Sequence, residues 1–210
     1  MAILTWPDVT TVLEMLPKSM ENTQNPLTLA LASPMNGDVN TYSLPGSRWG
    51  RTVTFRRQTY AQRRVVEGYL LQLEGQANRI RMWDFTNPTP GGTMNQTGVT
   101  VSALAAQFAE SIILTGCGNT LTMKSGDWFE VTTSAGQQLL RCTADATSNS
   151  SGVMTVNFKY RLRGSVAATS SVILQKPMCM YIQMDPKLVI PYDPQGTAPE
   201  FAVSFIEAFR

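Results

Sequence analysis

The sequence predicts a mainly β protein with a single helix, and three observations lead to this fold class. Apolar and polar residues alternate over many short stretches, which is the pattern of strands with one buried face. Turn-forming Gly, Pro, Asn and Asp separate these stretches at intervals of roughly eight to twelve residues in the second half of the chain. Only residues 59–74 combine apolar spacings of three and four with helix start and stop signals.

The helix is predicted from its ends as well as from its apolar face. Thr59 offers a hydroxyl at the N-cap position, and Gln62 is placed to complete a capping box. Gly75 follows the last apolar position, where a left-handed residue can end a helix. The residues expected on the buried face are Val66, Tyr69, Leu70 and Leu73.

Strands are expected on both sides of this helix. Residues 49–55 alternate before it, and residues 80–83 run out after it. Residues 201–209 alternate at the end of the chain, and a terminal strand this apolar must pair inside a sheet. We therefore expect the helix to cover one face of a sheet that contains all three strands. Residues 27–32 predict a further strand, followed by a turn at 36–38.

The composition shifts at residues 87–92, Asn-Pro-Thr-Pro-Gly-Gly, which marks the clearest boundary in the chain. Short strands and turns then follow closely up to residue 170, as in a small barrel or sandwich. The sequence thus predicts a discontinuous β-sandwich or barrel-like domain, residues 1–92 and 171–210, with residues 93–170 inserted as a small β-barrel domain.

Composition argues against several function classes. Hydrophobic residues make up 43% of the chain and charged residues only 15%, with a net charge of +2, so nothing favours nucleic acid or a membrane as partner. Histidine is absent, which removes the commonest general base and zinc ligand. No nucleophile and base pair can be named, and a cell-wall hydrolase ranks last among the hypotheses. We expect no enzyme activity, no catalytic residues, no cofactor and no metal.

The expected compartment follows from the cysteines and the N-terminus. Cys117, Cys142 and Cys179 are odd in number and widely spaced, which favours buried reduced thiols over a disulfide framework. Neither a signal peptide nor a run of eighteen apolar residues is present. The protein is expected to fold in a reducing cytoplasm.

Three motifs leave alternatives open. Arg56, Arg57, Arg63 and Arg64 form either a solvated start of the helix or a patch that binds phosphate or a partner. Residues 125–131, Ser-Gly-Asp-Trp-Phe-Glu-Val, predict a turn and a new strand; alternatively, an exposed Trp128 is a candidate contact for a glycan or a partner. Asp185, Asp193 and Glu200 lie in a Pro-rich loop, where solvated turn residues are favoured over a cation site.

A succession of short motifs resembles the distal tail or tail-tip structural proteins of long-tailed (siphovirus-like) bacteriophages. The motifs, in chain order, are Pro45-Gly46-Ser47-Arg48-Trp49, Leu73-Glu74-Gly75, Pro90-Gly91-Gly92-Thr93, Ser125-Gly126-Asp127-Trp128, Tyr160-Arg161-Leu162-Arg163 and Phe205-Ile206-Glu207-Ala208-Phe209. The resemblance implies an adaptor between the tail tube and the adsorption apparatus, without catalytic residues. It also implies ring-forming β modules, often with a second domain of the oligosaccharide-binding (OB-like) type.

The first hypothesis is therefore a virion structural protein at the phage tail tip, made in the host cytoplasm, which self-assembles into a trimeric or hexameric ring. Its partners would be the tail tube and the tail-tip or hub proteins. The alternative is a carbohydrate- or receptor-binding module for host adsorption that contacts a host surface glycan through Trp128. The loops at 87–93 and 186–199 are predicted to reach neighbouring subunits.

Overall fold

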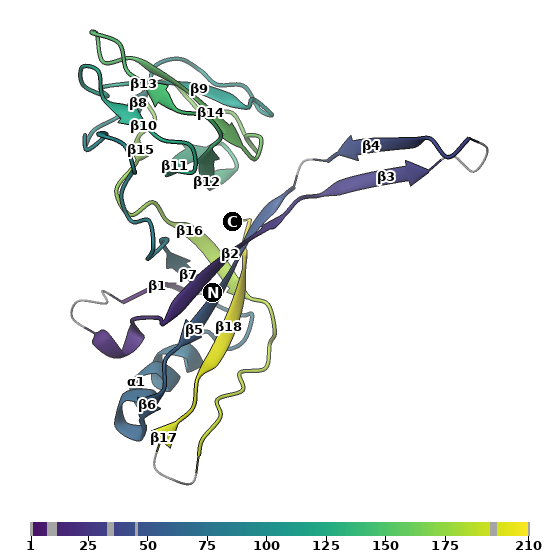
Figure 1. The fold of residues 1–210 in the computed structure, drawn as a ribbon, viewed down its shortest axis with the longest axis vertical. Helices are drawn as coiled ribbons and strands as arrows, with labels where there is room; N and C mark the ends of the chain where they lie inside the picture. The colour runs from purple at the N-terminus through teal and green to yellow at the C-terminus, as the bar shows by residue number, and fades with distance from the viewer. Residues whose placement is uncertain (1, 8–11, 33–35, 45, 194–196, 210) are drawn as a thin grey trace. The chain divides into compact units, whose positions relative to one another are not determined.

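The fold is mainly β in a computed structural model that describes residues 2–7, 12–32, 36–44, 46–193 and 197–209. The chain forms two compact units (Figure 1). The first unit contains residues 1–23, 49–86 and 179–209, and the second contains residues 24–48 and 87–178.

These units divide the chain at 86/87 and 178/179, whereas the sequence predicts boundaries at 92/93 and 170/171. The difference has a physical cause. Val172 pairs with Val131 of the barrel, and the Lys176 backbone N–H donates to the Pro88 carbonyl at 2.6 Å, so both flanks of the predicted insertion are bonded into the second unit. Residues 24–48 also belong to this unit and not to the domain predicted for residues 1–92.

A six-stranded sheet forms the first unit, in the order β1-β7-β16-β18-β5-β2 (Figure 1). Its strands are β1 (Ile3–Thr5), β2 (Ser19–Asn25), β5 (Arg48–Phe55), β7 (Arg79–Met82), β16 (Cys179–Gln183) and β18 (Phe201–Glu207). The strands predicted before and after the helix are confirmed as β5 and β7. The C-terminal strand pairs between β5 and β16, as its apolar alternation requires.

Helix α1 (Tyr60–Leu71) begins with the predicted capping box: the Thr59 hydroxyl accepts from the Gln62 backbone N–H, and the Gln62 side chain accepts from the Thr59 N–H. The helix ends at Leu71, three residues before the predicted end, and turns carry the chain to Gly75, which has φ +66°. Val66, Leu70 and Leu73 are buried as predicted.

Trp6 connects this helix to the sheet. Its ring packs against Tyr69 of α1 at 6.3 Å, Phe55 of β5 at 6.0 Å and Phe205 of β18 at 6.5 Å between centroids. The helix therefore covers one face of the sheet, as predicted. A short 3-10 helix, η1 (Leu13–Met15), buries Met15, and a two-stranded ladder joins β6 (Gln58–Thr59) to β17 (Thr197–Ala198).

A second six-stranded sheet, ordered β15-β11-β12-β14-β9-β8, forms the barrel-like part of the second unit. Its strands are β8 (Thr100–Val101), β9 (Ser111–Thr115), β11 (Trp128–Thr133), β12 (Gly136–Cys142), β14 (Met154–Lys159) and β15 (Val172–Ile173). A bridge between Thr100 and Ser171 joins the two ends of this order, so the sheet nearly closes into a barrel. In the same unit, β10 (Thr122–Met123) and β13 (Ala146–Thr147) pair antiparallel as a separate two-stranded ladder.

The barrel encloses the hydrophobic core of the second unit. Phe129 and Phe158 meet edge to face at its centre, 5.7 Å between ring centroids. Cys117 and Cys142 are buried thiols without a disulfide in the same core, as predicted, and the Cys179 thiol, buried in the first unit, donates to the Glu207 carboxylate at 3.0 Å. Burial raises the pKa of Cys117 to about 11 and that of Cys142 to about 12, so both stay protonated at neutral pH.

Removing the helix cap is expected to have a modest, well-defined effect. We expect Thr59→Ala to lower the free energy of unfolding by about 1 kcal/mol, because the Gln62 N–H loses its acceptor. Urea denaturation followed by circular dichroism measures this change. Thr59→Ser keeps the hydroxyl and should restore most of the loss; equal destabilisation by both variants would show that the cap is not the cause.

Candidate functional site

Several exposed apolar side chains of the second unit lie on a hairpin, residues 24–48, which we call the β-arm. It consists of β3 (Thr28–Ala32) and β4 (Val39–Ser43), paired antiparallel over five residues each. The predicted strand at 27–32 is thus confirmed, and its partner is the strand after the predicted turn. Every residue of both strands is exposed to solvent.

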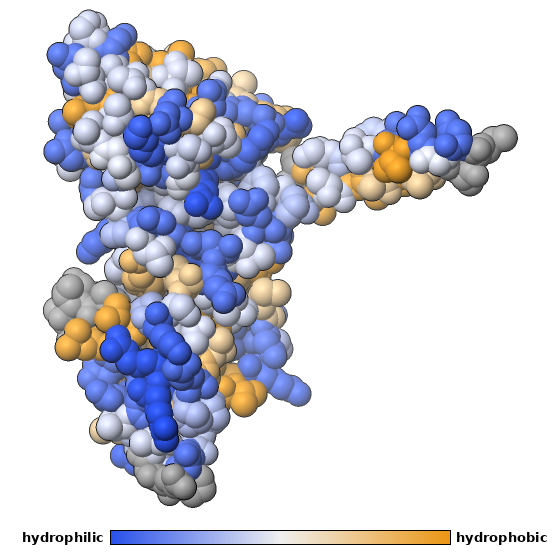
Figure 2. All heavy atoms as spheres, in the orientation of Figure 1, coloured by the Kyte–Doolittle hydropathy of each residue, from blue (hydrophilic) through white to orange (hydrophobic). Residues whose placement is uncertain are grey.

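One face of the β-arm carries a stripe of large apolar side chains. Directly paired residues share a face of a sheet, so Leu29 lies beside Tyr42, and the 2.8 Å backbone bond from Leu44 to Leu27 extends this pattern. The stripe consists of Leu27, Leu29, Leu31, Tyr42 and Leu44, each between 44% and 53% exposed. Figure 2 shows apolar atoms along the β-arm.

Charge is nearly absent from the β-arm. Between Asn25 and Ser47 the sequence contains one charged residue, Asp38, beside the turn. Soluble proteins protect exposed strands with Lys, other charges or Pro, because unpaired edges promote association. A two-stranded hairpin is also marginally stable alone in water. The β-arm therefore exposes apolar side chains with little of the charge that usually protects an exposed strand.

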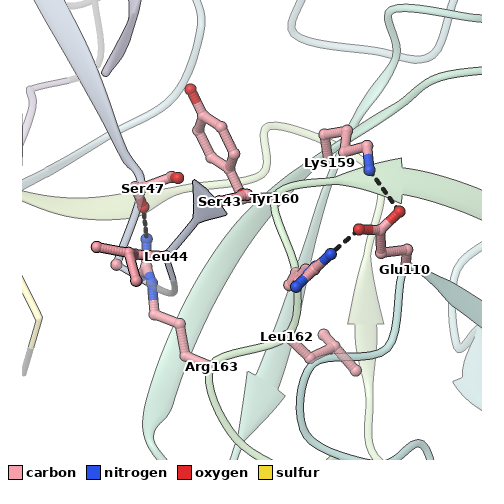
Figure 3. A pocket seen from close by; sticks show the side chains of 10 residues that line it. Ser43, Leu44, Ser47, Glu110, Lys159, Tyr160, Leu162 and Arg163 are labelled. Carbon is pink, nitrogen blue, oxygen red and sulfur yellow. Dashed lines mark hydrogen bonds and ion pairs between the residues drawn. The ribbon is translucent and has the colours of Figure 1, made fainter. Parts of the chain in front are cut away.

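The base of the β-arm is fixed by side-chain contacts within the second unit. The Ser47 hydroxyl accepts from the Leu27 backbone N–H at 3.2 Å, and the Ser47 carbonyl accepts from Arg163 Nη2 at 3.2 Å (Figure 3). Arg163 follows β14, and its backbone N–H donates to the Gln138 side chain at 2.9 Å. The hairpin thus starts from a bonded position on the barrel.

A small cavity lies beside this base. It has a volume of about 50 Å³ and is lined by residues 43–44 and 46–47 of the β-arm together with Glu110 and residues 159–163 (Figure 3). The Glu110 carboxylate accepts from Arg161 Nε at 2.8 Å and from Lys159 Nζ. These two hydrogen bonds, from Lys159 first and then Arg161, lower the pKa of Glu110, which is therefore ionised at neutral pH.

Trp128 does not form the predicted exposed platform. The residue begins β11 after the predicted turn, but its side chain is only 3% exposed. Its cross-strand neighbour Arg141 places its guanidinium 4.9 Å from the ring centroid. Stacking on a sugar needs an open ring face. The favoured prediction of a turn and a new strand is therefore confirmed, and the alternative of an exposed Trp128 is wrong, because Arg141, thirteen positions further along the chain, lies over the ring.

The arginine cluster divides into two kinds of residue. Arg56, Arg57 and Arg64 are exposed, as a solvated helix start predicts. Arg63 is fully buried: its Nη2 donates to the Pro199 carbonyl at 2.7 Å, and its guanidinium lies 4.2 Å from the Phe201 ring centroid. Burial lowers the pKa of Arg63. For Arg63 the solvated interpretation is wrong, because residues far along the chain cover it.

The acidic residues of the Pro-rich loop do not converge. Glu200 pairs with Lys18 at 2.7 Å, Asp185 accepts from the Lys187 backbone N–H at 2.9 Å, and Asp193 lies 3.8 Å from Arg57. Within the described ranges no group of three or more His, Cys, Asp or Glu side chains is arranged to hold a metal ion. Residues 194–196 of the predicted contact loop lie outside the described residues, and the intersubunit role of both loops stays a prediction.

No protein-family model matches the chain, and no curated protein matches it significantly. Among the residues that the structure describes, no helix has both the length and the hydrophobicity needed to cross a bilayer. The candidate site therefore rests on the β-arm itself, a hairpin with few charges and an exposed apolar face.

Proposed function

We propose that this protein is a virion structural protein of the tail tip of a long-tailed bacteriophage and that it acts by self-association into a ring. The ring would be a trimer or a hexamer that joins the tail tube to the tail-tip or hub proteins. The single observation that supports this most strongly is the β-arm, with its exposed apolar stripe and its few charges. The order of motifs along the sequence supports the same role.

Physical chemistry favours a permanent contact for the β-arm. Leaving the stripe in water forgoes hydrophobic stabilisation of about 25 cal/mol per Å² of apolar surface. Interfaces in lasting assemblies are larger and more apolar than transient ones. When the same arm docks on a different patch of the next copy, the contact is heterologous and generates a ring if the rotation closes.

The experiment is the mass of the purified chain in solution, by light scattering over a concentration series. We expect a discrete trimer or hexamer. Changing Leu27, Leu29 and Leu31 together to Ser should lower the measured mass to that of a monomer, because the stripe loses its apolar contact. The matched control changes three exposed apolar residues outside the β-arm, Leu71, Leu104 and Val189, to Ser and should leave the mass unchanged.

Two results would contradict the proposal. A wild-type chain that remains monomeric at every concentration would exclude self-assembly by the chain alone, and an intact ring in the β-arm variant would exclude the β-arm as its interface. Location is tested separately by antibody labelling of phage particles that carry the gene. Label confined to the distal end of the tail is expected, and label elsewhere would contradict a tail-tip role.

A further inference from the structure

The cavity at the base of the β-arm has an excess of positive charge. Its lining contains three cationic side chains, Lys159, Arg161 and Arg163, and one carboxylate, Glu110 (Figure 3). The surface of the whole chain is nearly neutral by contrast, with a net charge of +2 over 210 residues. Lys159 and Arg161 share the single carboxylate of Glu110, so these three groups together carry one net positive charge. A further negative group beside them would balance that charge.

The donors around the cavity are only partly used. Glu110 takes the Nε–H of Arg161 and one hydrogen of Lys159. A guanidinium has five N–H donors and an ammonium has three, so both groups retain donors for a ligand. Their side chains are 47% and 55% exposed, which leaves these donors within reach of a molecule arriving from solvent.

The size of the cavity limits what it can hold. Its volume of about 50 Å³ corresponds to a few water molecules, since one water needs roughly 10–15 Å³ on this measure. That space suits a single small group and excludes a sugar ring or a nucleotide base. Planar guanidinium groups match the oxygens of carboxylates and phosphates.

We propose that this cavity is a binding site for one compact oxyanion, the phosphate or carboxylate group of a ligand. Lys159 and Arg161 provide charge-assisted hydrogen bonds from one side, next to the Ser43 and Ser47 edge of the β-arm. Glu110 orients both cations through its two hydrogen bonds and at the same time opposes the anion by its own charge. This site is independent of the proposed ring, because it needs only residues of one copy.

The test is titration of the full chain with inorganic phosphate and, separately, with acetate, by calorimetry at an ionic strength of about 10 mM, where screening is weak. We expect saturable binding of at least one of the two, weakened by added NaCl. Arg161→Gln or Lys159→Gln should weaken it about tenfold, the loss of one charge-assisted hydrogen bond. Lys124→Gln is the matched control, because Lys124 forms an exposed ion pair with Asp145 at 2.7 Å in the same unit, and it should bind like the wild type.

Glu110→Gln makes the test independent of folding defects. Removing the carboxylate frees both cations and removes a repelling charge, so we expect binding to tighten about threefold or more. A damaged protein would not gain affinity. Unchanged affinity in both the Arg161 and Glu110 variants, or no saturable binding of either anion to the wild type, would overturn the proposal.

A polymer distinguishes a free phosphate ion from a phosphate group that belongs to a larger anionic chain. Poly(glycerol phosphate) is titrated at the same phosphate concentration as inorganic phosphate. Tighter binding of the polymer that is lost in Arg161→Gln identifies a phosphate group within an anionic chain as the ligand. Equal binding identifies the free ion, and both outcomes keep the same site.

Discussion

Phe158→Ala is expected to lower the free energy of unfolding of the second unit by about 3–5 kcal/mol, the largest effect among the substitutions considered. The Phe158 ring is almost fully buried and meets Phe129 edge to face in the barrel core. Alanine removes that aromatic contact and leaves a cavity that β14, held by ladders to both β12 and β9, cannot close. Urea denaturation and hydrogen exchange of the barrel strands measure the loss.

Ile113→Ala provides the comparison. Ile113 lies on β9, next to β14, but its side chain is 42% exposed, so its removal should cost less than about 1 kcal/mol. If the two variants were destabilised equally, the closed apolar core described for the barrel would be incorrect.

Gly92→Ala is expected to destabilise the second unit by about 3 kcal/mol, although it adds only one methyl group. A Cβ atom at this position would lie 2.1 Å from the Thr122 carbonyl oxygen and 2.7 Å from its carbon. These are backbone atoms, so no side-chain rotation relieves the clash. The segment must move away, which breaks the 3.0 Å bond from the Met94 N–H to the Thr122 carbonyl.

The adjacent glycine makes the control. A Cβ atom at Gly91 would meet the Asp127 side chain at 3.3 Å and Lys124 Cβ at 4.0 Å. Gly91→Ala should therefore lower the free energy of unfolding several-fold less than Gly92→Ala does. Both unfolding free energies come from urea denaturation under the same conditions. Equal stability of Gly92→Ala and the wild type would show that residue 92 does not lie against β10.

Local patterns predicted the elements well where neighbours in the sequence decide the structure. The capping box of α1 joins residues three positions apart, and the β11–β12 hairpin joins consecutive strands across a short turn. The end of α1 was less predictable. Leu71 is exposed at 60%, and the last turn gives way to a series of turns before Gly75.

The sequence predicts the strand of the candidate site but not its exposure. Alternation at Leu27, Leu29 and Leu31 predicts a strand with one apolar face, but it does not tell whether another element covers that face. In the structure this apolar face remains exposed to solvent. The scarcity of charge between Asn25 and Ser47, where only Asp38 is charged, is the signal that could have identified the β-arm, because exposed strands are usually protected by charged residues.

The sequence by itself determined the β class, the helix with its cap, the strands that flank it and the apolar terminal strand, because each depends on periodicity or on contacts between near neighbours. Only the tertiary structure decided which side chains are buried and which charged side chains pair. Arg63 is covered by residues 198–201, Trp128 by Arg141, and Glu110 is joined to Lys159 and Arg161, whereas the β-arm stripe remains exposed. These outcomes depend on which distant segments meet, and side-chain chemistry along one strand or helix does not encode the identity of the segment packed against it.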